Sequence, residues 1–441
     1  MAESHLTREL LRAVLRREVA PWVLVEIGTS HLMSLCEHCR DEIEAFWKEL
    51  SGDASMRYLQ TFEVLPALLD DEIRRMERER NQATRDLREL LRLSRDEREG
   101  RVRRARGRFR SPFLIRSLIE ESRQHLPSGA AEALHLAGLA RTIVQLSPSI
   151  PGAFDLLALA TAEKGNACRV LDDVVQAEES FGHVRLLVTE HGVTEPAILA
   201  RVAELEASLR KDQRRFPEAE ALLAQAMVHY QISGDNQGLA RVLLKLADTY
   251  FLAGHFDRAV EQARSTLETI HPEADRRLYL CARHNLAFYL TETGAYKEAA
   301  AVVAEDQDRY HEFPDAWTRL RLLWIFARIA AGTGSPADAE RGFLAARDGF
   351  VAEGNGYDAA MVTLELVLLY LRQGRTADVR QAAEEMVPIF HAQDVHREAL
   401  AALVLFQDAA RREELTVRKV REIAAYLREA RGNAGLRFQS K

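Results

Sequence analysis

The chain has 441 residues, of which 47% are hydrophobic and 29% are charged, and its formal net charge is −7. This length exceeds one compact core, so we expect two or more modules or a repeat array. The sequence lacks an apolar run long enough to span a bilayer, a signal-peptide core, and enough cysteines (four) for a disulfide framework. We therefore expect a cytoplasmic protein and exclude membrane-spanning and disulfide-stapled classes.

Residues 1–55 are expected to form a small helical element, with helices over 7–19 and 29–50 separated by Pro21. Its most specific signal is His31 followed by Cys36 and Cys39. A Cys-x-x-Cys pair suits tetrahedral zinc because two thiolates three residues apart can face one ion. The alternative is two reduced cysteines packed inside a small helical hairpin.

The segment from His31 to Arg40 resembles the zinc-binding helix of bacterial zinc-finger anti-sigma domains. That resemblance implies zinc as a possible cofactor, bound by His31, Cys36 and Cys39. The family has three residues between its histidine and first cysteine, whereas this chain has four. On a straight helix the offset becomes about 140° instead of about 40°. The fourth ligand stays open between His5 and His38.

Residues 56–150 are expected to be helical and to include a long basic amphipathic helix. Between residues 71 and 110 the sequence has 15 arginines and nine acidic residues, an excess of six positive charges. Interspersed signs favour a solvated helix with i,i+4 ion pairs. The alternative is a nucleic-acid contact surface on the arginine-rich helix 74–110. Gly107 and Ser111-Pro112 should end the basic stretch, and helices should follow over 112–125 and 129–146.

Residues 151–441 are dominated by a repeat of 40 residues. One position of the repeat is occupied by Phe216, Phe256, Tyr296, Pro336 and Thr376. Three residues later stand Ala219, Ala259, Ala299, Ala339 and Val379. Glycine precedes the first position by two residues at Gly254, Gly294, Gly334 and Gly374. Such self-similarity indicates supersecondary units that bury their apolar faces by stacking on one another.

These units resemble tetratricopeptide repeats, whose two helices cross closely at small residues. Twelve residues before the second-helix position stand Ala207, Ala247, Ala287, Ala327 and Val367. The aromatic residue of the first helix is present as Tyr250 and Tyr370 and is replaced elsewhere by Arg210, Leu290 and Ala330. The resemblance implies an all-α fold, a right-handed solenoid of helix hairpins. Two charged helices, near 397–412 and 416–431, should cap it after a smaller helical N-terminal region.

In this family the peptide-contacting side chains come from the first helix of each unit, on the concave wall. Register transfer assigns ten residues to that wall: Asn166, Arg169, Arg241, Lys245, Asp248, His284, Asn285, Arg321, Trp324 and Arg328. Asparagine and basic side chains there are expected to hold a peptide backbone or a carboxylate, since arginine offers a bidentate fork.

No phosphate-binding glycine loop, metalloprotease helix or nucleophile elbow occurs, so we do not expect an enzyme. The sequence favours a regulatory or scaffold protein that binds a protein or peptide through the repeat groove. The anti-sigma-like segment suggests bacterial transcriptional or stress signalling. The alternatives are a nucleic-acid-binding regulator and a sensor of a peptide or small molecule.

Overall fold

The computed structural model describes residues 7–15, 41, 45–46, 74–105, 107–273, 275–392, 397–412 and 414–430. Every regular element in these ranges is a helix. None of the described helices is long and apolar enough to cross a membrane. The chain divides into two compact units, residues 1–167 and 168–441. The domain boundaries expected after residues 55 and 150 stay predictions.

The first unit contains helix α1 (Arg8–Leu15) and a helix over 74–91. It continues with α5 (Arg95–Arg104), α6 (Pro112–His125), α7 (Ala130–Gln145) and most of α8 (Ala153–Val170). The expected helix over 112–125 is confirmed in both bounds, and that over 129–146 to within one residue. Helix α6 begins at Pro112 because proline fits the first helical turn, where its missing N–H is not needed.

The basic stretch forms two helices, so the expectation of one long helix ending near Gly107 is wrong. The first ends at residue 91, and Ser94 begins the second through a capping box with Glu97. Arg98 explains the break, because its buried guanidinium donates to the carbonyl oxygens of Leu90 (2.9 Å) and Leu91 (3.3 Å). These carbonyls lie in the last turn of the first helix, where the helix itself supplies no partner.

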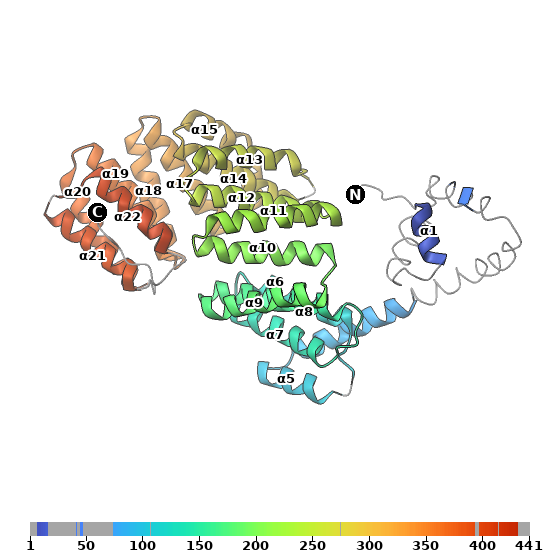
Figure 1. Cartoon of the computed structure of the whole chain (residues 1–441). Coiled ribbons are helices and arrows are strands. Elements are labelled where there is room, and N and C mark those ends of the chain that lie inside the picture. The colour runs from blue at the N-terminus through green and yellow to red at the C-terminus, as the bar shows by residue number, and fades with distance from the viewer. Residues whose placement is uncertain are drawn as a thin grey trace, which may run out of the picture. The chain divides into compact units, whose positions relative to one another are not determined.

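The second unit contains the end of α8, then α9 (Val174–His191), and then five two-helix repeats (Figure 1). The first helices of these repeats are α10 (Pro196–Asp212), α12 (Asn236–Leu252), α14 (Arg276–Glu292), α17 (Ala316–Gly332) and α19 (Gly356–Arg372). The second helices are α11 (Phe216–Ser233), α13 (Phe256–Thr269), α15 (Tyr296–Glu305) with α16 (Gln307–Glu312), α18 (Pro336–Ala352) and α20 (Thr376–Ala392). Helices α21 (Arg397–Arg411) and α22 (Val417–Ala430) follow.

The 40-residue rhythm predicts the helix starts correctly. All five second helices begin at the aromatic, proline or threonine position of the repeat. The small residues at both crossing positions are buried in every repeat. The four repeated glycines have φ between 70° and 85°, the left-handed region that glycine enters without a steric penalty. Each glycine therefore ends a first helix and turns the chain into the second.

The third repeat departs from the pattern, because its second helix is divided into α15 and α16 at Asp306. The Asp306 carboxylate is buried and accepts hydrogen bonds from Arg283 and Arg309. The break therefore falls at a buried carboxylate that anchors this helix to α14 through Arg283.

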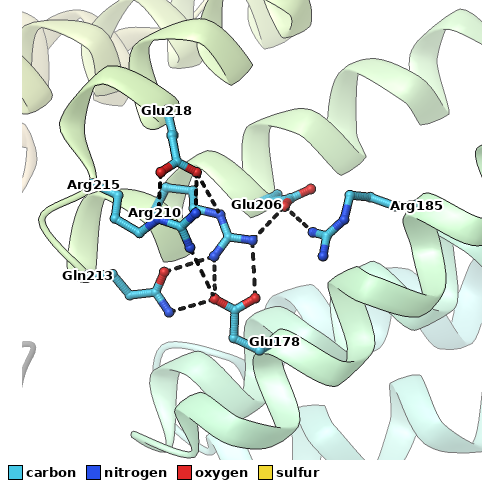
Figure 2. Close-up of polar contacts among 7 residues, drawn as sticks. All are labelled: Glu178, Arg185, Glu206, Arg210, Gln213, Arg215 and Glu218. Atoms are coloured by element: carbon cyan, nitrogen blue, oxygen red, sulfur yellow. Dashed lines mark hydrogen bonds and ion pairs between the residues drawn. The ribbon is translucent and has the colours of Figure 1, made fainter.

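The first repeat joins α9 through a polar network centred on Arg210 (Figure 2). Arg210 stands where later repeats have Tyr250 and Tyr370, and only 5% of its side chain is exposed. Its guanidinium donates to both carboxylate oxygens of Glu178 on α9 and to Glu206 at 2.9 Å. Burial opposes the charged form of Arg210, but the two carboxylates outweigh burial and raise its pKa. A charged junction therefore replaces the aromatic contact at this end of the repeats.

Candidate functional site

The first helices of the repeats enclose a cavity of about 850 Å³. Residues of α12, α14, α17 and α19 line it, and residues 169–174 and 209–214 lie at one end. Leu427 and Arg428 of the terminal helix α22 also line it, because α22 packs on α19. A cavity of this size, lined by both apolar and charged groups, is suited to a small molecule or a short peptide segment.

A row of three aromatic side chains crosses the cavity lining. Phe251 of α12, Phe288 of α14 and Trp324 of α17 all line it. The ring centroids of Phe251 and Phe288 are 5.4 Å apart, and those of Phe288 and Trp324 are 5.7 Å apart. Both pairs meet edge to face, the arrangement that aromatic quadrupoles favour. The row gives the cavity a rigid apolar surface.

Arg328 is a lining cation whose charge is already balanced inside the protein. Only 10% of its side chain is exposed, and it pairs with Glu292 at 2.7 Å and Glu365 at 2.8 Å. Its guanidinium also lies 4.7 Å from the centroid of the Phe288 ring. Burial raises the pKa of Glu365, whereas at Glu292 the nearby Arg328 and Arg428 outweigh burial and lower the pKa. This group ties three successive repeats together.

Arg321 differs from Arg328, because no carboxylate of the described residues lies within ion-pair distance of its guanidinium. It is half-buried on α17 and lies 5.5 Å from the centroid of the Trp317 ring. Trp317 also lines the cavity and is 40% exposed. A guanidinium held against an aromatic ring, with free donors facing a cavity, is suited to bind an anionic group.

Two further cations of the lining, Arg169 and Lys211, are compensated by carboxylates. Arg169 pairs with Asp212 at 2.5 Å, and Lys211 with Asp248 at 2.6 Å. The partners are 43 and 37 residues apart in the chain, so each pair links one helix hairpin to the next. These ion pairs therefore stabilise the contact between successive hairpins and also line the cavity.

Five of the ten residues predicted for the concave wall line this cavity: Arg169, Asp248, Arg321, Trp324 and Arg328. The other five do not. Asn166 is buried in the first unit, and Asn285 is half-buried on α14. His284 is buried with its Nδ1 3.1 Å from the Tyr310 hydroxyl, and burial holds its pKa well below the usual value. A binding role for any of the ten stays a prediction.

Arg241 and Lys245 lie beside the buried carboxylate of Glu204, which the sequence analysis did not identify. The Glu204 carboxylate is 1% exposed and accepts from Lys245 Nζ at 3.0 Å and from the Tyr230 hydroxyl at 2.7 Å. Arg201 lies at 3.1 Å and Arg241 at 3.9 Å. A usable signal was present in the sequence, since opposite charges 36 to 41 residues apart recur along the first helices.

The predicted zinc ligands His31, Cys36 and Cys39 lie outside the described residues. Within the described ranges, no group of three or more histidine, cysteine, aspartate or glutamate side chains could hold a metal ion.

Comparison with known proteins supports the assignment of the repeats. Residues 198–270 match the family model described as tetratricopeptide repeat. The fold is an α-solenoid of tetratricopeptide-like hairpins. No curated protein matches the sequence.

Two solved structures share this fold. A Rap protein complexed with Competence and Sporulation Factor superposes with a TM-score of 0.55 at 14% identity. The apo form of RapI superposes with a TM-score of 0.52 at 9% identity. Each match covers 70% of this chain and 85% of the other. At such low identity the likeness establishes the fold alone.

Proposed function

We propose that this chain is a non-enzymatic regulatory protein whose repeat cavity binds a peptide or protein segment carrying a carboxylate. The observation that carries the proposal is the Arg321 guanidinium, which faces the cavity without an internal carboxylate partner in the described part of the chain. The aromatic row of Phe251, Phe288 and Trp324 supplies an apolar surface beside it. A carboxylate on Arg321 and an apolar side chain on the row would together fix the orientation of a peptide.

The fold comparison is consistent with this proposal. The Rap protein of similar fold was solved in complex with Competence and Sporulation Factor, so one protein with this architecture binds a partner. The cavity of this chain has its own lining, and we therefore argue the ligand class from Arg321 and the aromatic row.

The first experiment selects binders from a random peptide library with free C-terminal carboxylates and measures their dissociation constants by fluorescence anisotropy. Arg321→Ala is expected to weaken the selected peptides by at least tenfold, because a hydrogen bond to a charged group contributes about 1.5–3 kcal/mol. Phe288→Ala should also weaken binding, through loss of apolar contact.

Arg319→Ala is the matched control, since Arg319 is exposed on the same helix α17, does not line the cavity, and carries the same charge. It is expected to bind the selected peptides like the wild type. The proposal fails if Arg321→Ala and Arg319→Ala bind equally well, or if the library yields no binder.

We further propose that the regulatory role lies in bacterial transcriptional or stress signalling and involves zinc. The support is the resemblance of the segment containing His31, Cys36 and Cys39 to zinc-finger anti-sigma domains. Elemental analysis of purified protein is expected to find about one zinc per chain, since these ligands suit a structural site. The Cys36→Ser/Cys39→Ser variant should lose it, and a metal-free wild-type protein would contradict the zinc proposal.

A further inference from the structure

An exposed row of arginines runs along the helix over 74–91 and into the turn that follows it. The row consists of Arg78, Arg85, Arg88 and Arg92, with Asn81 between the first two, and all five are exposed. At 100° per residue these positions fall within an arc of about 80°, and at 1.5 Å per residue they extend over about 21 Å. Three of the row arginines therefore share one face of the helix, and Arg92 follows in the turn directly after it.

The acidic residues of this helix are largely bound by arginines outside the row. Arg108 pairs with Asp86 at 2.8 Å and Glu89 at 2.5 Å, and Arg101 also pairs with Glu89 at 2.8 Å. Glu79 pairs with Arg75 at 3.5 Å, and Glu77 precedes the row. Within the described residues, no carboxylate lies within ion-pair distance of any of the four row arginines.

The opposite face of the helix is anchored in the first unit, where Ala83, Asp86 and Leu90 are buried. The row therefore faces solvent on a helix that cannot rotate to hide it. Arg85 donates to the Gln82 side chain at 3.0 Å, a contact that leaves its charge uncompensated.

We propose that this row binds the phosphate backbone of double-stranded DNA without reading its sequence. Guanidiniums pair with phosphates in a bidentate manner, and contacts to phosphates carry no sequence information. A protein partner fits less well, because every exposed side chain between residues 74 and 92 is polar or charged and offers no apolar anchor.

The same surface discriminates against other nucleic acids. Single strands are bound by stacking on aromatic side chains, and residues 74–92 contain none. Duplex RNA is recognised through its 2′-hydroxyls, which need polar groups beside the cations. Here the Gln82 amide donates to Asp86 and the Thr84 hydroxyl donates to the Arg80 carbonyl, so only Asn81 is available.

Fluorescence anisotropy with the full chain and a labelled 20-base-pair DNA duplex tests this proposal. Four phosphate contacts predict a slope of about −3.6 for the logarithm of the association constant against the logarithm of the salt concentration. Affinity should then fall roughly 100-fold between 50 and 200 mM salt. The fourfold variant Arg78→Ala/Arg85→Ala/Arg88→Ala/Arg92→Ala is expected to bind at least tenfold more weakly at 50 mM salt, with a slope near zero.

The matched control removes four arginines that are already ion-paired and more than half exposed: Arg75, Arg103, Arg341 and Arg418. Their replacement by alanine makes the same change in net charge and should leave the slope unchanged. Replacing the row by lysines keeps the charges and should retain binding within a few-fold. If the fourfold variant unfolds, Arg85→Ala and Arg88→Ala alone should each reduce the slope by about 0.9.

Three outcomes would overturn the proposal. The first is a wild-type protein that does not bind the duplex at 50 mM salt. The second is a control variant that loses as much affinity as the row variant, which would reduce the effect to net charge. The third is equal or tighter row-dependent binding of single-stranded DNA, duplex RNA or polyglutamate.

Discussion

Replacing Glu204 by alanine is expected to lower the free energy of unfolding by about 3–5 kcal/mol, the range for breaking a buried ion pair from one side. Glu204 lies on α10 with 1% of its side chain exposed. Its removal would leave Lys245, Arg201 and the Tyr230 hydroxyl without their shared acceptor. Urea unfolding followed by circular dichroism at pH 7 measures the loss.

Glu218→Ala is the matched control, because Glu218 on the neighbouring α11 is 50% exposed, pairs with Arg215 at 2.5 Å and lies at the longer distance of 3.9 Å from the buried Arg210. An exposed pair contributes at most about 1 kcal/mol, so this variant should unfold almost like the wild type. Equal losses for Glu204→Ala and Glu218→Ala would contradict the role assigned to the buried carboxylate.

The loss of stability at low pH should also depend on the Glu204 carboxylate. Burial alone would raise the pKa of Glu204, but Lys245, Arg201 and Arg241 outweigh burial and hold its pKa well below the usual carboxyl range. A group with a lowered folded-state pKa contributes stability above its unfolded pKa of about 4.3 and loses it as pH falls toward the folded value. Glu204→Gln should therefore lose less stability than the wild type between pH 5 and the acid transition, as urea titrations at several pH values can show.

The repeat geometry could be predicted from the sequence because it depends on local features that recur. Small residues such as Ala247 and Ala259 set the helix crossing, and glycines such as Gly254 adopt the left-handed turn. Both requirements act within one hairpin, so a fixed spacing in the chain reports them directly. For this reason the helix starts agree with the rhythm from Phe216 to Thr376.

The partners of the charged residues could not be predicted in the same way. Register places Arg241, Lys245 and Arg328 on the first helices, but their counter-ions lie on neighbouring repeats, at Glu204, Glu292 and Glu365. Whether a cation faces a ligand or an internal carboxylate depends on how far successive helices are displaced along one another. The 40-residue period of the sequence gives no measure of that displacement. The observed contacts do, because they join residues that are 37 positions apart instead of 40.

The break in the basic stretch shows a second limit. The apolar stripe ends at Leu90, but no proline follows until Pro112, so the sequence predicts one helix. The break depends on Ser94 with Glu97, and on the side chain of Arg98 reaching back to the Leu90 carbonyl. The capping box could be recognised in the sequence. The contact of the Arg98 side chain with the end of the preceding helix could be found only from the structure.

Replacing Ala327 by leucine is expected to lower the free energy of unfolding of the repeat region by about 3 kcal/mol, the upper end for overpacking a core. Ala327 of α17 is 1% exposed and lies where α18 crosses. A Cβ atom added to Gly342 of α18 would lie 2.9 Å from the Ala327 Cβ and 3.3 Å from its Cα. The two backbones are therefore nearly in contact, and three additional carbons can enter only by separating the helices.

A pair of glycine substitutions isolates this crossing from helix propensity. Alanine in place of a mid-helix glycine gains about 0.5–1 kcal/mol, and Gly138→Ala in α7 should show that gain because nothing lies within 4 Å of the added carbon. Gly342→Ala receives the same gain but meets Ala327, so it should destabilise the protein. Because each repeat is stabilised mainly by its neighbours, separating α17 from α18 weakens the array on both sides of the crossing. Urea unfolding of the three variants measures these changes in the free energy of unfolding. A Gly342→Ala protein as stable as Gly138→Ala would contradict the prediction, because it would show that α17 and α18 can move apart at little cost.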